Sequence, residues 1–364
     1  MRLRRAVVIA LGATRPGAVE LEVELDGGTR SALAYPDLVG PVGPGDTVIL
    51  NTAAVELGLG TGGVDFVVAV EGRDLDTAAI AGQVMKARYL PHQIAVSSVE
   101  ETHRDLLEAS PGLRGTPVVC APLHSMVAAV AAGAKRAGAA SKVIYVMTGG
   151  AALAGGFSRL VPELRDAGLL DGWITCGQTF GGELEAVTVW TGLLAAVEVM
   201  DAEIIVVADG PGNLGTDTTW GVSALESGNA LNAAHTLGGK PVPSVRVSFA
   251  DPRPRHRGLS HHSITILRDV CKVETNVPIP SLDDEGHRAA VWDAVKGAKL
   301  EEIHHVVETD GQPALDELRE RGMAPTSMGR AIEDDPAFWL SAGAAGVLAG
   351  RMSVQNRKWR TPPA

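Results

Sequence analysis

Short apolar runs separated by turn residues occupy the first 75 residues of the chain. Their β-branched character predicts strands over residues 6–11, 19–25, 31–35, 47–50 and 66–70. The turn residues include Pro44, Gly45 and Asp46, and a glycine-rich loop lies at 58–63. Strands this short need closure or a cover to hide their edges. We therefore expect a small N-terminal antiparallel β-barrel or sandwich domain at residues 1–75.

The pattern changes near residue 115, where continuous apolar runs begin to alternate with helical segments. The apolar runs predict strands buried on both faces, at residues 117–120, 143–147, 173–176, 204–208, 245–249 and 303–307. The other segments predict helices at 126–137, 157–167, 184–200, 218–235 and 285–298. Repeated alternation of this kind predicts an α/β domain at residues 115–351, with a doubly wound, mostly parallel, Rossmann-like sheet.

Three further segments complete the expected organisation. Residues 76–114 connect the two domains, and Ser98 and Glu101 have the spacing of a capping box, which predicts a helix start. An alanine- and glycine-rich stretch at 333–351 predicts a last packed helix. Residues 352–364 are expected to form a loose tail.

Composition adds one unusual feature to this picture. Glycine supplies 43 of 364 residues, about 12% against roughly 7% on average, whereas aromatic residues supply only 4%. The glycines have no G-X-Y period, which excludes collagen, so they indicate many tight turns. The scarcity of aromatic rings argues against a stacking platform for single-stranded nucleic acid.

The charge and the cysteines bear on partners and location. The formal net charge is −11, and an acidic surface disfavours general binding to nucleic acid or to anionic membranes. Cys120, Cys176 and Cys271 lack metal-ligand spacing and lie in or beside apolar runs, so we expect free thiols in a reducing cytoplasm. The first residues imitate a signal peptide but show no clear cleavage site, and no apolar run approaches the length of a membrane span. These observations predict a cytoplasmic protein.

Three successive predicted strands end in glycine-rich turns that lead into helices. The glycines concerned are Gly149, Gly150, Gly177, Gly181, Gly182, Gly210, Gly212 and Gly215. Ligands of open α/β sheets bind at the carboxyl ends of the strands, where glycine lets backbone N–H groups approach an anion. The third turn matches G-x-G-x-x-G, but the acidic residue of a dinucleotide site is missing about 20 positions later. Tight packing explains any one such turn, whereas three together predict a small anionic or nucleotide-like ligand.

Asp209, Asp251 and Asp310 each follow a predicted strand and precede glycine or proline. If those strands are neighbours, the three carboxylates line one rim and suit a Mg²⁺ ion that bridges a phosphate. The alternative is that aspartate is simply a favoured turn residue.

The densest basic run of the chain lies at residues 251–263. It contains Arg253, Arg255, Arg257, His261 and His262. Arginine binds phosphate or carboxylate through two hydrogen bonds, and histidine can transfer a proton near pH 7. The histidine pair opens a segment, 261–271, that favours a helix over a strand. Surface charge or an oligomer contact is the competing explanation, although two prolines in the run favour a preorganised site.

Ser125 lies where a predicted strand passes into a helix, as the nucleophile of a serine hydrolase does. That strained turn needs small residues two positions either side of the serine, and here they are Leu123 and Val127. Ser125 is therefore better explained as a helix N-cap.

Three strings carry a resemblance to a known family: GLGTGG at residues 58–63, GGELEAV at 181–187 and, most specifically, FADPRPRHRGLSHHS at 249–263. On these strings the chain resembles an uncharacterised bacterial family that is common in actinobacteria and related Gram-positive lineages, known as domain of unknown function 3866. The likeness covers nearly the whole chain. It implies no activity, substrate or catalytic residue.

The sequence thus favours an enzyme that binds a phosphorylated or nucleotide-like small molecule, with Mg²⁺ or a nucleotide as a possible cofactor. The glycine turns would hold the ligand, the three arginines would neutralise its charge, and His261 or His262 would transfer a proton. One alternative is a non-catalytic ligand sensor or interaction protein, whose β domain docks a partner. A second is a serine hydrolase at Ser125. A homo-oligomer is compatible with each of these alternatives.

Overall fold

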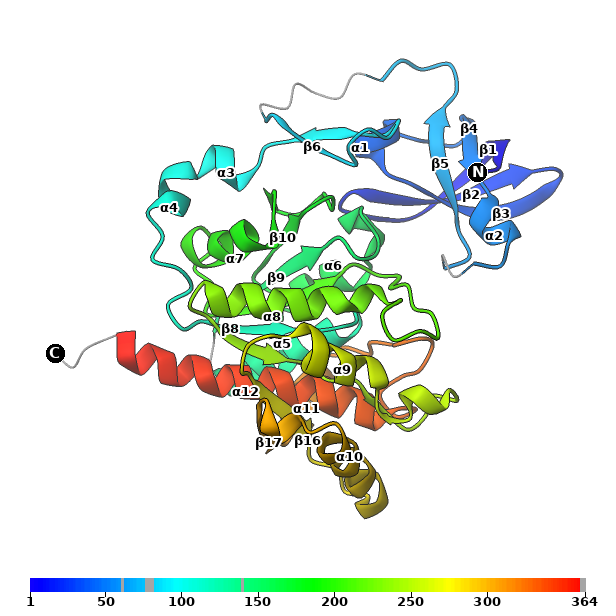
Figure 1. The fold of residues 1–364 in the computed structure, drawn as a ribbon. Coiled ribbons are helices and arrows are strands. Elements are labelled where there is room, and N and C mark those ends of the chain that lie inside the picture. The colour runs from blue at the N-terminus through cyan, green and yellow to red at the C-terminus, as the bar shows by residue number, and fades with distance from the viewer. Residues whose placement is uncertain (60–61, 76–81, 139–140, 361–364) are drawn as a thin grey trace.

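The N-terminal strands close into a five-stranded barrel, in the order β1-β2-β3-β5-β4 (Figure 1). Its strands are β1 (Leu3–Arg15), β2 (Ala18–Leu25), β3 (Gly28–Ala34), β4 (Thr47–Asn51) and β5 (Asp65–Val70), with the short helices α1 (Pro36–Val39) and α2 (Ala53–Glu56). All pairs are antiparallel except β3 with β5. Alternate side chains such as Val8, Val23 and Leu50 fill the interior, as the period of two along a strand requires. The N-terminal β structure expected from the sequence as a barrel or a sandwich is thus a closed barrel, antiparallel except for one pair of strands.

This computed structural model describes residues 1–59, 62–75, 82–138 and 141–360. Residues 60–61 of the predicted glycine-rich loop, residues 76–81 of the connecting segment and residues 361–364 of the predicted tail lie outside these ranges.

The connecting segment is anchored to the rest of the molecule by a buried lysine. It contains the hairpin β6 (Val84–Lys86) and β7 (Ile94–Val96) and the short helices α3 (Val99–Thr102) and α4 (Arg104–Glu108). Lys86 is fully buried, donates to the Ala186 carbonyl oxygen at 2.9 Å and lies 3.3 Å from the Glu185 carboxylate. The capping box of Ser98 and Glu101 is present at the start of α3, as predicted.

A six-stranded parallel sheet forms the centre of the molecule, in the order β11-β10-β9-β12-β8-β13. The strands are β8 (Pro117–Cys120), β9 (Val143–Thr148), β10 (Gly172–Cys176), β11 (Leu184–Ala186), β12 (Ile204–Asp209) and β13 (Lys240–Pro243). One face packs on α5 (Met126–Gly138), α6 (Leu160–Asp166), α11 (Gln312–Glu320) and α12 (Pro336–Arg360). The other packs on α7 (Val189–Glu198) and α8 (Glu226–Thr236).

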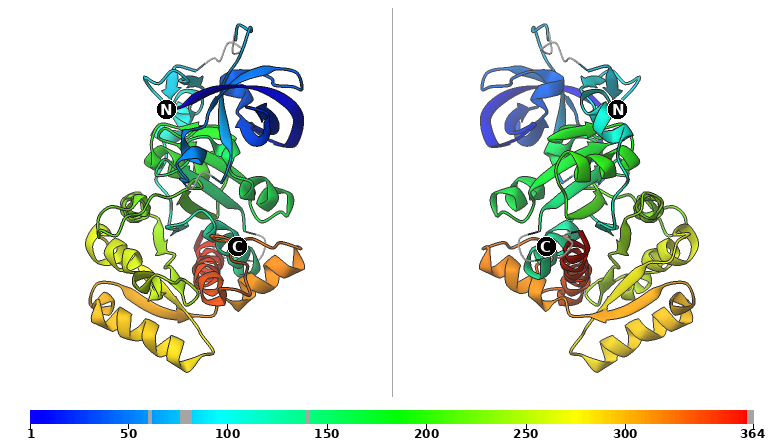
Figure 2. Two further views of the ribbon diagram at one scale, coloured as in Figure 1. Left: turned by 90° about the vertical axis from the view of Figure 1, so that its right-hand side faces the viewer. Right: turned by 90° about the vertical axis from the view of Figure 1, so that its left-hand side faces the viewer.

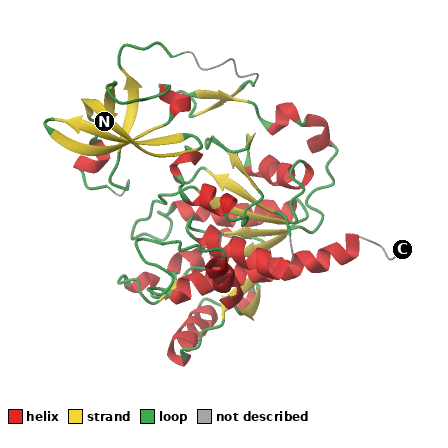
Figure 3. Ribbon diagram, turned by 180° about the vertical axis from the view of Figure 1, so that it is seen from behind, coloured by secondary structure: helices red, strands yellow, loops and turns green. Residues whose placement is uncertain are grey.

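Helices on both faces explain why the strands are apolar throughout, and Figure 3 shows this parallel sheet apart from the barrel strands. The α/β class and the parallel sheet are confirmed. The strand order, however, is not the 3-2-1-4-5-6 order of the dinucleotide-binding Rossmann sheet.

Two segments predicted as strands of this sheet lie elsewhere. Within 245–249, only β14 (Val247–Ser248) is a strand, and it pairs with β15 (Gly258–Leu259). The segment predicted at 303–307 gives β17 (His305–Thr309), which pairs with β16 (Asn276–Pro280) in a separate two-stranded sheet beside α10 (Glu285–Gly297) (Figure 2). The strand that completes the main sheet is β13, whose Pro241 and Pro243 hid it from prediction. Proline is tolerated there because β13 is an edge strand.

Helix boundaries differ from prediction in three places. The segment 184–200 opens with strand β11 before α7 begins, and 218–235 is helical mainly in α8, after a long loop. The segment 261–271 is helical as expected, with α9 (His261–Thr265) followed by a π-helical turn. Finally, α12 continues to Arg360, so a helix covers most of the tail that was expected to be loose.

Helices α5 and α12 pack backbone against backbone. A Cβ atom added at Gly346 would lie 2.0 Å from the Val130 carbonyl oxygen, and one at Gly133 would lie 2.6 Å from the Gly343 carbonyl oxygen. Glycine is therefore required on both helices, which explains part of the compositional excess. Although α12 has 25 residues, neither it nor any other helix within the described ranges is long and apolar enough to span a membrane.

We predict that Gly346→Ala lowers the free energy of unfolding by about 1–3 kcal/mol, because its methyl group would collide with the backbone of α5. Gly297→Ala is the matched control, since a Cβ there meets nothing within 4 Å. Urea unfolding followed by circular dichroism would measure both. Equal midpoints for the two variants would contradict this account of the helix contact.

Candidate functional site

The topology places a crevice at the carboxyl ends of β9 and β12. These strands are neighbours in the sheet, and Thr148 pairs with Asp209 at their ends. From β9 the chain passes through α6 to β10 on one face, whereas from β12 it passes through α8 to β13 on the other face and in the opposite direction. Such a switch point is where open α/β sheets bind their ligands.

Asp209 joins the two strand ends through its side chain. Its carboxylate accepts hydrogen bonds from the Thr148 hydroxyl at 2.7 Å, the Gly150 N–H at 2.9 Å and the Asn213 amide at 3.1 Å. Burial raises the pKa of this carboxyl, and the three hydrogen bonds act against that rise. The predicted position of Asp209 at a strand end is confirmed.

His124 lies beside Asp209 in the same crevice and was not predicted as a site residue. Its Nδ1 lies 3.1 Å from the Tyr145 hydroxyl and 3.2 Å from the Asp209 carbonyl oxygen. Its Nε2 lies 2.8 Å from the Ser158 hydroxyl, which also accepts the Val161 N–H at 3.1 Å. Burial lowers the pKa of His124 to about 4, so the ring is neutral at pH 7. Sequence reasoning missed it because its partners are far along the chain.

The three glycine-rich turns meet at this edge of the sheet. The Gly155 N–H donates to the Phe180 carbonyl oxygen at 2.8 Å, the Phe180 N–H donates to the Leu153 carbonyl oxygen at 2.9 Å, and the Ala152 N–H donates to the Pro211 carbonyl oxygen at 3.0 Å. Each turn is thereby tied to at least one of the others.

The predicted ligand-binding glycines divide into two groups. A Cβ at Gly150, Gly182 or Gly210 would lie 2.3, 2.7 and 2.2 Å from a neighbouring atom, so packing alone requires glycine there. At the other five positions, a Cβ would meet nothing closer than 3.8 Å: Gly149, Gly177, Gly181, Gly212 and Gly215. Only this second group has space for a ligand.

Two adjoining cavities lie between these turns and the barrel. The larger, of about 770 Å³, has Arg15, Glu20, Arg159 and His124 in its lining; it is called the polar cavity for these side chains, although apolar atoms form most of its surface. The smaller, of about 530 Å³, is mainly apolar and aromatic, with Tyr35, Leu38, Phe66, Phe157, Phe180 and Leu214 among its lining residues. Phe157, Pro211 and Gly212 line both cavities, so the two adjoin, and together they are called the cleft.

The basic run at 251–263 has partners of its own. Arg253 donates to Asp251 at 2.8 Å, Arg255 pairs with Asp217, and Arg257 donates to the Phe249 carbonyl oxygen at 3.2 Å. The Arg253 hydrogen bonds hold the pKa of Asp251 well below its usual range. None of these arginines lines either cavity of the cleft.

The predicted rim of three carboxylates is wrong. Asp209 ends β12 of the main sheet, Asp251 follows β14, and Asp310 follows β17, so the three belong to three different sheets. Asp310 instead accepts the Gln312 N–H at 2.8 Å and caps the start of α11, in agreement with the turn explanation.

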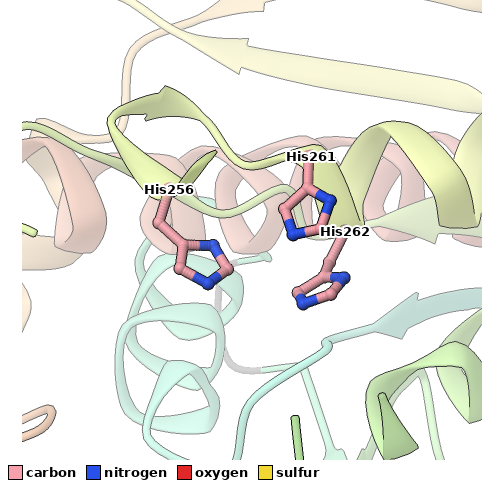
Figure 4. Close-up of side chains that lie close together, drawn as sticks. All are labelled: His256, His261 and His262. Carbon is pink, nitrogen blue, oxygen red and sulfur yellow. The ribbon is translucent and has the colours of Figure 1, made fainter. Parts of the chain in front are cut away.

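His261 and His262 lie together with a third histidine, His256 (Figure 4). They line neither cavity of the cleft. Burial, together with nearby arginines, lowers the pKa of His256 to about 3 and that of His262 to about 4, so both rings are neutral at pH 7.

Among the described residues, no base is hydrogen-bonded to the Ser125 hydroxyl. That hydroxyl lies 2.9 Å from the Ser327 hydroxyl, whereas the neighbouring His124 ring contacts Ser158 instead. The geometry therefore gives no support to a hydrolase centred on Ser125. The cysteines Cys120, Cys176 and Cys271 are buried and free, as expected.

These features define an α/β protein in which an N-terminal β-barrel covers a cleft at the switch point of a parallel sheet. The model of the family described as "Protein of unknown function (DUF3866)" matches residues 31–346, from the barrel to α12. The chain therefore belongs to this family, as its motifs indicated. Comparison with curated proteins gives no match.

We predict that His124 makes the protein less stable as the pH falls. The ring is neutral in the folded state down to about pH 4, whereas the unfolded chain takes up the proton near pH 6.5, so acid favours unfolding between these values. The shift corresponds to a loss on the order of 3 kcal/mol. Urea unfolding at several pH values should show a shallower pH dependence for His124→Asn than for the exposed-site control His305→Asn. Equal slopes would show that His124 takes up its proton at the same pH in the folded and the unfolded protein.

Proposed function

We propose that this protein is an enzyme that binds a phosphorylated or nucleotide-like small molecule in the cleft between the barrel and the parallel sheet. One observation carries the proposal: a polar cavity with two arginines and an aromatic cavity adjoin directly over the switch point. A ligand bound at the switch point would make the protein Rossmann-like in the location of its site, although the order of its strands differs.

The anionic part of the ligand would bind in the polar cavity. Arg15 and Arg159 both pair with Glu20 there, at 2.7 and 2.6 Å. A phosphate group would compete with Glu20 for these guanidinium groups, which bind phosphate through two hydrogen bonds. The open turn at Gly212 lies at the same cavity and lets the backbone approach the ligand.

The planar or apolar part of the ligand would bind in the aromatic cavity. The rings of Tyr35 and Phe66 are stacked with centroids 6.2 Å apart, and those of Phe66 and Phe157 are 6.1 Å apart. Tyr35 and Phe66 belong to the barrel domain, whereas Phe157 directly follows the first glycine-rich turn of the parallel sheet. The contact between barrel and sheet therefore forms this pocket. An apolar wall with a few polar groups at one end is typical of small-molecule sites.

In this proposal, His124 is the residue that transfers a proton. A neutral imidazole at the cleft can accept a proton, and it is held in place by the Asp209 carbonyl oxygen. His261 and His262, the sequence-based candidates, lie outside the cleft lining. Of the three carboxylates considered for Mg²⁺, Asp209 alone lies at this crevice, so a magnesium ion would have to be held largely by the ligand's phosphate.

A non-catalytic ligand sensor is the second candidate. It is favoured by the fact that both ring nitrogens of His124 already have protein partners, which leaves none free for a substrate. The barrel that covers the cleft would then carry the signal to a partner. Turnover of a bound ligand distinguishes an enzyme from a sensor.

The setting we propose is the cytoplasm of a bacterium, with a small anionic ligand rather than nucleic acid or a membrane as the partner. The three buried free thiols fit a reducing compartment. Self-association is compatible with this proposal and is not required by it.

We predict that one or more nucleotides or sugar phosphates raise the melting temperature by several degrees at saturating concentration. Arg159→Gln should raise the ligand concentration that is needed for the same temperature shift at least tenfold, because the substitution removes a cation from the cleft. Arg257→Gln is the matched control, since that arginine is exposed and lies outside the cleft lining. Phe66→Leu should weaken binding of nucleotides more than binding of inorganic phosphate. Flat melting curves for the whole series, or equal effects of the two arginine variants, would refute the proposal.

A further inference from the structure

Three histidine side chains converge near the start of α9, outside the cleft described above. His256 ends the 3₁₀ turn Pro254–His256, and His261 and His262 are the first residues of α9. One ring nitrogen of each lies within 4.8 Å of the other two, and the rings of His261 and His262 have centroids 3.8 Å apart. Figure 4 shows the rings of His261 and His262 next to each other, with the His256 ring on the opposite side of a small gap.

Within the part of the chain that the structure describes, two nitrogens of this cluster are buried without a hydrogen-bond partner. They are Nε2 of His261 and Nδ1 of His262, and the His262 side chain belongs to a residue that is only 8% exposed. A buried polar atom without a partner is rare and unfavourable. Two such atoms lie on adjacent rings that face a third ring. This arrangement indicates that a bound species interacts with the two unpartnered nitrogens.

The third ring is held in the form that a metal ligand needs. His256 Nδ1 lies 2.9 Å from the Ser260 hydroxyl, and its Nε2 lies 3.2 Å from the Arg255 Nε–H. Because a guanidinium can only donate, Nε2 carries the lone pair and Nδ1 carries the proton that is donated to Ser260. Metal-bound histidines typically donate their second nitrogen to such a partner.

We propose that His256, His261 and His262 form a three-histidine binding site for a divalent transition-metal ion, with Zn²⁺ as the reference case. Neutral imidazoles are preferred ligands of zinc, and three of them leave a fourth position for water or another ligand. Tetrahedral zinc holds its nitrogens about 3.3 Å apart, so the rings need only small rotations from their present spacing. The site is independent of the ligand proposed for the cleft.

The surrounding charges permit this ion. Arg246 and Arg253 share the single carboxylate of Asp251, and Arg255 pairs with Asp217, so part of their positive charge is compensated. A metal ion would displace the Arg255 Nε–H from His256, and the Asp217 carboxylate would keep that guanidinium nearby. The same arginines would suit an oxyanion held by imidazole N–H groups, which is the competing occupant.

Zinc titration of the untagged, chelator-treated full-length protein tests the proposal. We expect one Zn²⁺ per chain by calorimetry and by elemental analysis after dialysis. His256→Asn and His262→Asn should each weaken zinc binding at least about 100-fold, whereas His305→Asn, at an exposed histidine, should leave it unchanged. Ser260→Ala should weaken it about 10-fold or more, as expected for the partner of a metal ligand. Zinc binding that is absent, or equal in all variants, would overturn the proposal.

A measurement on the wild-type protein covers the case in which the variants fail to fold. X-ray absorption of the 1:1 zinc complex should show three imidazole nitrogens and one further light atom at about 2.0–2.1 Å. A shell that contains sulfur, or fewer than three imidazoles, would place the ion elsewhere. Stabilisation by inorganic phosphate that is lost in His262→Asn, with no zinc uptake, would instead assign the cluster to an oxyanion.

Discussion

The carboxylate of Asp209 is the constraint on which the cleft depends. Strands β9 and β12 end side by side, and the chain leaves them in opposite directions, so side-chain and turn contacts are needed to hold the crevice beyond their ends. Asp209 supplies those contacts by accepting from Thr148, Gly150 and Asn213. A buried carboxylate is tolerated when its hydrogen bonds are satisfied, and the resulting network rigidifies its surroundings. Gly150 has to be glycine for the carboxylate to approach so closely.

The position of the barrel follows from the same turns. The Arg15 side chain donates to the Gly156 carbonyl oxygen at 2.7 Å, and a Cβ at Gly156 would lie 2.8 Å from the backbone of Gly17. Barrel and turn therefore meet backbone to backbone at one end of the cleft. At another end, buried Lys86 and Glu185 tie the connecting hairpin to the sheet edge. The cleft is bounded by rigid contacts on both sides, and its lining residues come from segments that are distant in sequence.

The sequence predicted those elements whose structure is decided by the local pattern of residues. It did not predict contacts between residues that are far apart in the chain. The barrel strands, the sheet strands β8, β9, β10 and β12, and the capping box of α3 were predictable from periodicity and spacing, whereas β11 lies in a segment that predicted a helix. Strand β13 was missed because two prolines break its pattern, and the Asp310 prediction failed because nothing local shows that β17 pairs with β16. The contact between His124 and Ser158 joins residues 34 positions apart. Similarly, no motif shows that Arg255 is already paired with Asp217.

The packing of α12 against α5 has a consequence for how the protein is made. The two helices touch through their backbones, yet almost the whole sheet, the histidine cluster and the small β16–β17 sheet lie between them in the chain. During synthesis, the apolar face of α5 therefore stays uncovered until the glycines of α12 have been added. Exposed surface of this kind attracts other chains, and contacts that are distant in sequence form slowly. Docking of α12 is therefore the step that completes the packing of α5, and until then the chain is exposed to aggregation.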